Sequence, residues 1–367
     1  MSTVDVLSPI NISVLTGFLG SGKTTLLNRL LSHPGMSDTA VLINEFGEIG
    51  LDHLFVKSVS ENVVLLDSGC LCCTVREDLV ESLRELFALR VRGEVPAFRR
   101  VIVETTGLAD PAPILQTLAT DPTLVERFRL ESVITTVDAC FGLGQLDQHR
   151  ESIKQAALAD RLIVTKTDVA SKEAVADLQR RLERLNPGAT IRAVVFGEVT
   201  PDDVFGVTPH DAARAETATR WLNADAYAAA AARRDQDHHH DHDHAHGDDH
   251  DHDHGHAALD VNRHDDRVRA FCLTADEPIV WERLSEWVRR LLADHGENIL
   301  RIKGILDVAG TPEPVIIHGV QHVFYPTARL DAWPDADRRS RVVVITRDVE
   351  REPIEASFRA ALAGPAP

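Results

Sequence analysis

Short apolar runs alternate with amphipathic stretches through the first half of the chain. The runs are apolar at nearly every position, instead of at every second one, and they are rich in Val and Ile. This pattern is typical of strands that are buried on both faces of a sheet. We predict such strands at residues 10–16, 40–44, 63–66, 100–104, 132–138, 161–165 and 190–195.

The stretches between these runs carry apolar residues at helical spacing, three or four positions apart. Buried strands that alternate with helices form parallel sheets covered on both faces. The first part of the chain, residues 8–222, is therefore predicted to be an α/β domain with a mostly parallel sheet. The predicted helices cover residues 23–32, 75–90 and 172–185.

The periodic pattern stops after Trp221. An Ala-rich stretch and a tract of His and Asp follow, and their low complexity cannot supply a hydrophobic core, so we predict a disordered linker at 223–264. Periodic segments resume near Arg267 and predict a smaller α+β domain at 265–350, with a C-terminal helix and tail at 351–367. The expected strands are 267–273, 299–308, 314–319 and 341–346, and the expected helices are 281–292 and 353–362.

Composition narrows the classes of function. The formal net charge is −18, and residues 235–256 hold eight Asp and no Lys or Arg. No nucleic-acid partner is expected, because a protein that binds the phosphate backbone needs a basic face. No membrane association is expected either, since no apolar run has the length of a membrane span and no signal peptide is visible. Five Cys, three of them within four residues, suit a thiolate cluster in a reducing compartment, so we predict a cytoplasmic protein.

Residues 17–24, GFLGSGKT, match the phosphate-loop pattern G-x-x-x-x-G-K-[ST] between a predicted strand and a predicted helix. In that context, backbone N–H groups cradle phosphate oxygens at the helix N-terminus, so the α/β domain at 8–222 is predicted to be a P-loop NTPase domain. We expect Lys23 to reach the β- and γ-phosphates and the Thr24 hydroxyl to hold Mg²⁺. The predicted nucleotide contacts of this loop are Gly17, Gly20, Ser21, Gly22, Lys23, Thr24 and Thr25.

The tetrapeptide Thr165-Lys166-Thr167-Asp168 follows another predicted strand and indicates which base is bound. The Asp168 carboxylate can accept hydrogen bonds from guanine N1–H and the 2-amino group, a donor pair that adenine lacks. The stem of Lys166 can pack along the base. Thr165 stands where GTPases usually carry Asn, and its hydroxyl can still hydrogen-bond the phosphate loop. We therefore predict GTP as the nucleotide.

The segment Glu104-Thr105-Thr106-Gly107 comes at the end of the strand at 100–104. An acid at this point is positioned for the Mg²⁺ shell, usually through water, and Gly107 can approach the γ-phosphate. The alternative for Glu104 is an exposed loop carboxylate. We predict catalytic roles for Lys23, Thr24 and Glu104. Intrinsic hydrolysis should be slow, because no arginine finger or water-positioning Gln can be recognised.

A loop after the strand at 63–66 carries three thiols. Cys70, Cys72 and Cys73 can supply three Zn–S bonds of about 2.3 Å and leave one position open, which suits a site that must release its metal. Buried apolar cysteines and a redox pair are the alternatives. Glu48 is a candidate oxygen ligand, with a solvated switch carboxylate as an equal alternative. All these loops follow strands of one sheet, so we expect thiols and nucleotide at the same carboxyl edge.

Residues 235–256 also hold ten His. Neutral imidazole binds zinc, nickel, cobalt and copper, and closely spaced His on a floppy chain offer many overlapping weak sites. An expression tag, which would be terminal and unbroken, and a merely solvated linker are the alternatives. We predict a metal reservoir formed by His238, His239, His240, His242, His244, His246, His250, His252, His254 and His256. The isolated Cys140 and Cys272 are interpreted as core residues.

Together these motifs resemble the CobW-type metallochaperone GTPases, relatives of the urease and hydrogenase nickel-insertion GTPases. The resemblance covers nearly the whole chain, and its C-x-C-C motif between a phosphate loop and an ETTG segment is highly specific. The stretches that carry it are GFLGSGKTTLLNRLL (17–31), NEFGEIGLD (44–52), DSGCLCCTVREDL (67–79), ETTGLADP (104–111), TKTD (165–168) and LRIKGIL (300–306).

The resemblance implies a GTPase domain, a linker often rich in His, and a small C-terminal CobW-type domain. It implies slow GTP hydrolysis with Mg²⁺, coupled to transfer of Zn²⁺, or alternatively Co²⁺, to a client protein. Two other functions are alternatives: a metal-buffering protein that works through its His tract, and a cobalt chaperone for corrinoid synthesis. A homodimer is an alternative for the assembly. By position, the resemblance makes Cys70, Cys72 and Cys73 metal ligands and Lys23, Thr24 and Asp168 nucleotide contacts.

Overall fold

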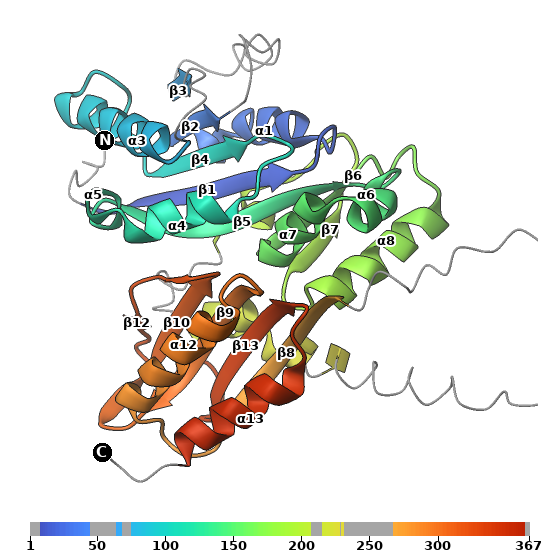
Figure 1. The fold of residues 1–367 in the computed structure, drawn as a ribbon. Helices are drawn as coiled ribbons and strands as arrows, with labels where there is room; N and C mark the ends of the chain where they lie inside the picture. The colour runs from blue at the N-terminus through green and yellow to red at the C-terminus, as the bar shows by residue number, and fades with distance from the viewer. Residues whose placement is uncertain are drawn as a thin grey trace, which may run out of the picture.

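The computed structural model describes residues 8–44, 64–67, 75–206, 215–227, 229–230 and 267–363. These residues form two sheets, each accompanied by helices (Figure 1). The first sheet has seven strands in the order β3-β2-β4-β1-β5-β6-β7, and every pairing is parallel. Its strands are β1 (Ile10–Gly17), β2 (Thr39–Asn44), β3 (Val64–Asp67), β4 (Arg100–Thr105), β5 (Phe128–Asp138), β6 (Arg161–Thr165) and β7 (Thr190–Ala193).

The predicted parallel α/β domain is confirmed. The central strands are buried on both faces, as their continuous apolar runs require; in β5 only Arg129 is exposed. Since all the strands run the same way, the loops that follow them meet at one edge of the sheet. The helices between them are α1 (Lys23–Leu31), α3 (Val75–Arg92), α4 (Ala112–Thr120), α5 (Pro122–Val125), α6 (Gly142–Gln148), α7 (Arg150–Leu158), α8 (Lys172–Leu185), α9 (Pro201–Val204) and α10 (Ala215–Leu222), with a 3₁₀ turn η1 (Pro34–Met36).

Several of these elements differ from the expectation. β5 begins at Phe128 instead of residue 132, because its first residues extend the pairing with β1. Helices α4 and α7 were not predicted. Six of the nine residues of α4 are buried, so it lacks the polar face that marks an amphipathic helix. In α7 the buried face includes Ser152 and Gln155, and these polar residues obscure the helical period.

The second sheet is antiparallel in all its described pairings, which confirms the predicted α+β domain. Its strand order is β11-β10-β9-β13-β8, with β12 beside β10. Two helices cover it, and Trp287 and Phe358 join them edge to face, with ring centroids 4.9 Å apart. The elements are β8 (Val268–Ala275), α12 (Trp281–His295), β9 (Ile299–Val308), β10 (Thr311–Val320), β11 (Val323–Phe324), β12 (Ala328–Arg329), β13 (Ser340–Arg347) and α13 (Arg351–Leu362).

The two domains share a continuous core. Helices α4, α7 and α8 lie between the parallel sheet and the second domain (Figure 1). Leu178 of α8 belongs to the same buried apolar cluster as Ala270 of β8 and Ile345 of β13. The Tyr325 hydroxyl donates a hydrogen bond to the carbonyl oxygen of Leu115 in α4, at 2.7 Å. Such a packed interface fixes the second domain against the helical face of the first.

A buried ionic network lies within this interface, at the start of β6. The Asp160 carboxylate accepts hydrogen bonds from Arg301 at 2.6 Å and from Lys303 at 2.7 Å, both on β9. The Lys303 ammonium also lies 4.9 Å from the centre of the Trp221 ring. Burial alone would raise the pKa of Asp160, but the two cations outweigh burial and hold that pKa far below its usual range. Burial, reinforced by the charge of Arg301, lowers the pKa of Lys303 to about 8.

Candidate nucleotide and metal site

The loop between β1 and α1 has the geometry of a phosphate cradle. Gly17 adopts a φ of 140°, and Gly22 caps α1 with a left-handed φ of 91°. A Cβ atom at Gly17 would lie 2.3 Å from Thr136 Oγ1, so only glycine fits at this contact with β5. The predicted phosphate loop therefore stands between a strand and a helix, as its pattern requires.

Hydrogen bonds from two neighbouring strands fix the middle of this loop. The hydroxyls of Ser21 and Thr136 lie 2.6 Å apart. Thr165, at the end of β6, donates its hydroxyl hydrogen to the carbonyl oxygen of Ser21 at 2.7 Å. The hydrogen bond that we expected from Thr165 to the phosphate loop is therefore present, even though GTPases usually carry Asn at this position.

Lys23 lies over the loop to which it belongs. Its Nζ atom donates hydrogen bonds to the carbonyl oxygens of Gly17, at 2.9 Å, and Phe18, at 3.3 Å. The ammonium group is thereby kept at the mouth of the cradle, where a charge-assisted contact with phosphate oxygens can replace these neutral acceptors.

Thr24 and Glu104 come together on the other side of the cradle. The Thr24 hydroxyl donates to Glu104 Oε1 at 3.2 Å. Glu104 is 7% exposed, so the alternative of an exposed loop carboxylate is wrong. A hydroxyl and a carboxylate are hard oxygen ligands of the kind that Mg²⁺ prefers, so the residues present fit a Mg²⁺ site beside the phosphates. A magnesium ion held here would neutralise charge on the phosphate oxygens.

These groups line a cavity of about 330 Å³ at the carboxyl edge of the sheet. The cavity brings together most of the predicted nucleotide contacts. Gly17, Ser21 and Thr165 support its floor through the contacts described above. The lining residues are Leu19, Gly20, Gly22, Lys23, Thr24, Thr25, Ile43, Glu104, Thr105, Thr106, Gly107 and Lys166.

The loop after β4 presses against the phosphate loop. A Cβ atom at Gly107 would lie 2.7 Å from the backbone nitrogen of Leu19, so the close approach requires glycine. Gln155 of α7 holds this loop by donating from Nε2 to the carbonyl oxygens of Gly107, at 3.2 Å, and Ala109, at 3.0 Å. Sequence analysis missed Gln155, since a lone glutamine in an unpredicted helix carries no recognisable signal.

The loop after β6 shows a second residue that sequence analysis missed. Lys166 adopts a left-handed φ of 57°, and its ammonium donates to Asp138 Oδ2 at 2.7 Å. Asp138 is buried, and its other oxygen accepts a hydrogen bond from the backbone nitrogen of Cys140 at 2.7 Å. Asp138 ends β5 in the same way that Glu104 lies near the end of β4. An acid at a strand tip was therefore the signal that could have identified it.

Asp168 is exposed and lies next to exposed apolar side chains. Val169, beside it in sequence, is 70% exposed, and Phe196 in the loop after β7 is 62% exposed. The two loops are joined by a hydrogen bond from the Thr167 hydroxyl to the carbonyl oxygen of Val194, at 3.0 Å. The loops after β6 and β7 thus present an exposed carboxylate and exposed apolar side chains.

The predicted metal ligands, Cys70, Cys72, Cys73, Glu48 and the ten His of the tract, lie outside the described residues and stay predictions. Within the described ranges, no group of three or more His, Cys, Asp or Glu side chains is placed to hold a metal. Cys140 is exposed, so its assignment to the core is wrong; the turn after β5 carries it to the surface. No helix in the described part of the chain is both long and apolar enough to cross a membrane.

Comparison with known protein families covers both domains. Residues 11–193 match the family described as CobW/HypB/UreG, nucleotide-binding domain. Residues 268–362 match the family described as Cobalamin synthesis protein cobW C-terminal domain. The two matches fall on the two sheets of the structure.

Individual proteins are similar to the chain along almost its whole length. It is 29% identical to the zinc chaperone YjiA of Escherichia coli K12, covering 96% of this chain and 98% of that protein. It is 30% identical to the zinc chaperone CobW of Pseudomonas aeruginosa, covering 97% of this chain and 92% of that protein. The crystal structure of Zn(II)-bound YjiA GTPase from E. coli matches with a TM-score of 0.64 and 25% identity, covering 97% of this chain and all of that one.

Proposed function

This chain belongs to the CobW family of P-loop GTPases, and we propose that it uses GTP to deliver a transition metal, above all zinc, to a client protein. The names of the two relatives described above, both zinc chaperones, support zinc as the cargo. In this proposal the protein acts in the cytoplasm, and a homodimer is one alternative for its assembly.

The nucleotide half of the proposal rests on the cavity beside the phosphate loop. Its lining supplies an ammonium from Lys23 and, from Thr24 and Glu104, a pair of oxygens for Mg²⁺. Asp168 supplies the acceptor for guanine. Slow hydrolysis is part of the proposal, because a switch must persist in its GTP state long enough to act.

The observation that carries the metal half is the position of β3. In the parallel pairing of β2 with β3, Asp67 lies opposite Ile43, and Ile43 lines the nucleotide cavity. Neighbouring strands lie about 4.8 Å apart. Asp67 ends β3, and Cys70 follows three residues later in the sequence, so the motif begins just after a strand that neighbours the cavity-lining β2. This proximity supports coupling between the nucleotide state and the metal affinity of Cys70, Cys72 and Cys73.

The test is the Zn²⁺ affinity of the protein with Mg²⁺–GTP and then with Mg²⁺–GDP, measured by chelator competition. A variant that lacks residues 235–256 keeps the weak His sites from masking the thiol site. Tighter binding with Mg²⁺–GTP, lost in Cys72→Ser, is the expected result. Equal affinity in both states would remove the coupling free energy on which a GTP-driven donor depends.

The alternative function is metal buffering by the tract, which the ten His of residues 235–256 favour. It predicts that deletion of the tract, and not Cys70→Ser, abolishes the effect of metal on GTP turnover. A cobalt chaperone would show stimulation of turnover by Co²⁺, and not by Zn²⁺, at buffered concentrations. Both ions accept thiolate and imidazole ligands, so the ligand type alone does not separate them.

A further inference from the structure

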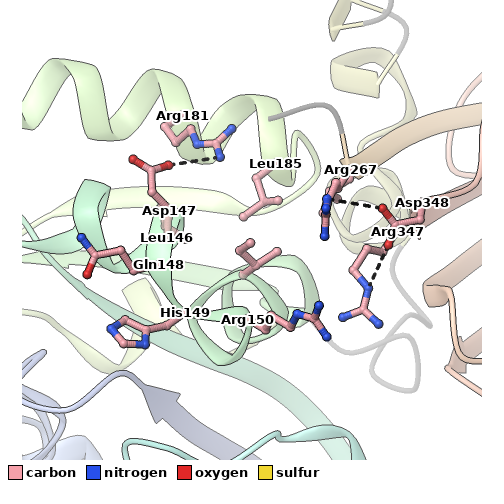
Figure 2. Close-up of a pocket in the computed structure, with 12 residues that line it drawn as sticks. Leu146, Asp147, Gln148, His149, Arg150, Arg181, Leu185, Arg267, Arg347 and Asp348 are labelled. Carbon is pink, nitrogen blue, oxygen red and sulfur yellow. Dashed lines mark ion pairs between the residues drawn. The ribbon is translucent and has the colours of Figure 1, made fainter. Parts of the chain in front are cut away.

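A second cavity, of about 310 Å³, opens between the two domains (Figure 2). The first domain contributes residues around the junction of α6 and α7 and from α8, and the second contributes the start of β8 and the end of β13. It shares no lining residue with the nucleotide cavity. Its lining residues are Leu146, Asp147, Gln148, His149, Arg150, Ile153, Arg181, Leu185, Arg267, Val268, Arg347 and Asp348.

The charge of this cavity is opposite to that of the chain. Four arginines line it, two from each domain, against two aspartates, whereas the chain as a whole carries −18. Figure 2 shows the guanidinium groups of Arg150, Arg267 and Arg347 around one space, with Arg181 on the far side of Leu185. Four like charges repel one another unless anions lie among them, so this arrangement favours an anionic ligand.

Asp348 satisfies the two arginines of the second domain poorly. The nitrogen–oxygen distances are 3.8 Å from Arg267 to Asp348 and 3.7 Å from Arg347 to Asp348. A well-formed charge-assisted hydrogen bond is about 2.7–2.9 Å long, and the buried pair of Arg301 with Asp160 is 2.6 Å. The guanidinium groups of Arg267 and Arg347 therefore keep hydrogen-bonding capacity for a further acceptor.

The remaining walls are apolar or polar but uncharged. Leu146, Leu185 and Val268 are buried and form apolar surface under the arginines. His149 provides the N-cap of α7 without a side-chain cap hydrogen bond, so the positive end of this helix adds to the charge of the arginines. A guanidinium rim over an apolar floor suits an organic anion better than a bare ion.

We propose that this interdomain pocket binds a small molecule that carries two or more phosphate or carboxylate groups and bridges the two domains. Arg150 binds it from the first domain, and Arg267 and Arg347 bind it from the second. Guanidinium groups pair with either anion through two parallel hydrogen bonds.

The pocket also adjoins the phosphate loop. The ring of His149, in its wall, stacks on Phe18 of that loop with centroids 4.5 Å apart. A ligand that orders the junction of α6 and α7 therefore acts on a contact of the nucleotide site. This inference does not depend on the identity of the transported metal.

The experiment titrates the full chain, saturated with GDP at a fixed free Mg²⁺ concentration, with inorganic pyrophosphate and, separately, with citrate, by isothermal calorimetry. We expect one saturable site whose affinity falls as NaCl is raised. Arg150→Ala and Arg347→Ala should each weaken it at least tenfold. The anion that binds more tightly identifies the ligand class, phosphate or carboxylate. Arg150 is exposed, so its substitution leaves the fold intact.

Arg289→Ala is the matched control, because this exposed arginine pairs with Glu286 on α12 and does not line the pocket. It should bind both anions like the wild type. Three results would each overturn the proposal: no saturable binding of either anion, an equal loss of affinity in the control, or a signal that disappears as the GDP concentration is raised. The last result would place the anion at the phosphate loop.

Discussion

Replacing Asp160 by Asn should destabilise the protein strongly, because it leaves two buried cations without their anion. The side chains of Asp160, Arg301 and Lys303 are 5%, 3% and 6% exposed. Breaking a buried ion pair by removing one partner costs about 3–5 kcal/mol. Asn keeps the size of the side chain, so the loss reports on charge rather than on packing.

The two cations should not share this penalty equally. Lys303 already has a pKa lowered to about 8, so it can lose its proton when the neighbouring carboxylate is removed. A guanidinium cannot be deprotonated in a protein, so Arg301 must keep its charge in the interface. Arg301→Met in the Asp160→Asn background should therefore restore more stability than Lys303→Met does.

Urea unfolding followed by tryptophan fluorescence measures these differences, since Trp221 lies against Lys303. Glu286→Gln is the control. It removes an acid that pairs with Arg289 and Arg290 on the exposed face of α12, where solvent screens an ion pair and leaves it little effect on stability. The reasoning is refuted if Asp160→Asn destabilises no more than this control, or if Arg301→Met gives no recovery.

Other predictions concern the nucleotide site and the same network. Gly107→Ala should weaken GDP binding roughly tenfold, because its Cβ would displace the Leu19 backbone, whereas Gly144→Ala, with open space around it, should bind normally in the same titration. Asp168→Ala should lose roughly 10- to 100-fold in GTP affinity and bind GTP and ITP alike, measured by competition; retained discrimination would remove Asp168 from base recognition. Between about pH 8 and 10.5 the unfolded chain binds a proton that native Lys303 lacks, so the stability of the wild type should rise with pH relative to Lys303→Met; equal slopes in paired urea titrations would contradict this.

The sequence predicted the parts of the structure whose signals are local. The phosphate loop has a fixed spacing and a required strand–loop–helix context, so its place in the fold could be predicted. The nearness of Thr24 to Glu104 could also be predicted, because both residues lie near the ends of parallel strands. Continuous apolar runs predicted the parallel strands because burial on both faces leaves no alternation.

The parts that depend on long-range contacts could not be predicted. Asp160 precedes Arg301 by 141 positions and Lys303 by 143, and no local pattern pairs it with either. Gln155 has a role only because α7 packs behind the loop after β4. The interdomain pocket needs arginines from both domains, and each of them taken alone resembles an ordinary surface residue.

Two short elements connect the domain interface with the nucleotide site. Strand β6 follows Asp160 and ends at Thr165, which binds the phosphate loop, so about 16 Å of strand separates the interface from that contact. At the end of helix α7, the carbonyl oxygen of Leu158 accepts a hydrogen bond from Arg301. Near the middle of the helix, Gln155 holds the loop that carries Gly107 by a hydrogen bond.

A shift at one end of β6 or α7 should reach the other end, because packed strands and helices move as units. A client that binds the second domain would therefore act on the phosphate loop and on the Gly107 loop together. If so, Asp160→Asn should change the GTP turnover rate at temperatures where the variant remains folded, and Arg301→Met in the same background should return it toward the wild-type rate. A variant with altered stability and unchanged GTP turnover would show that the interface holds the domains together and is not coupled to the nucleotide site.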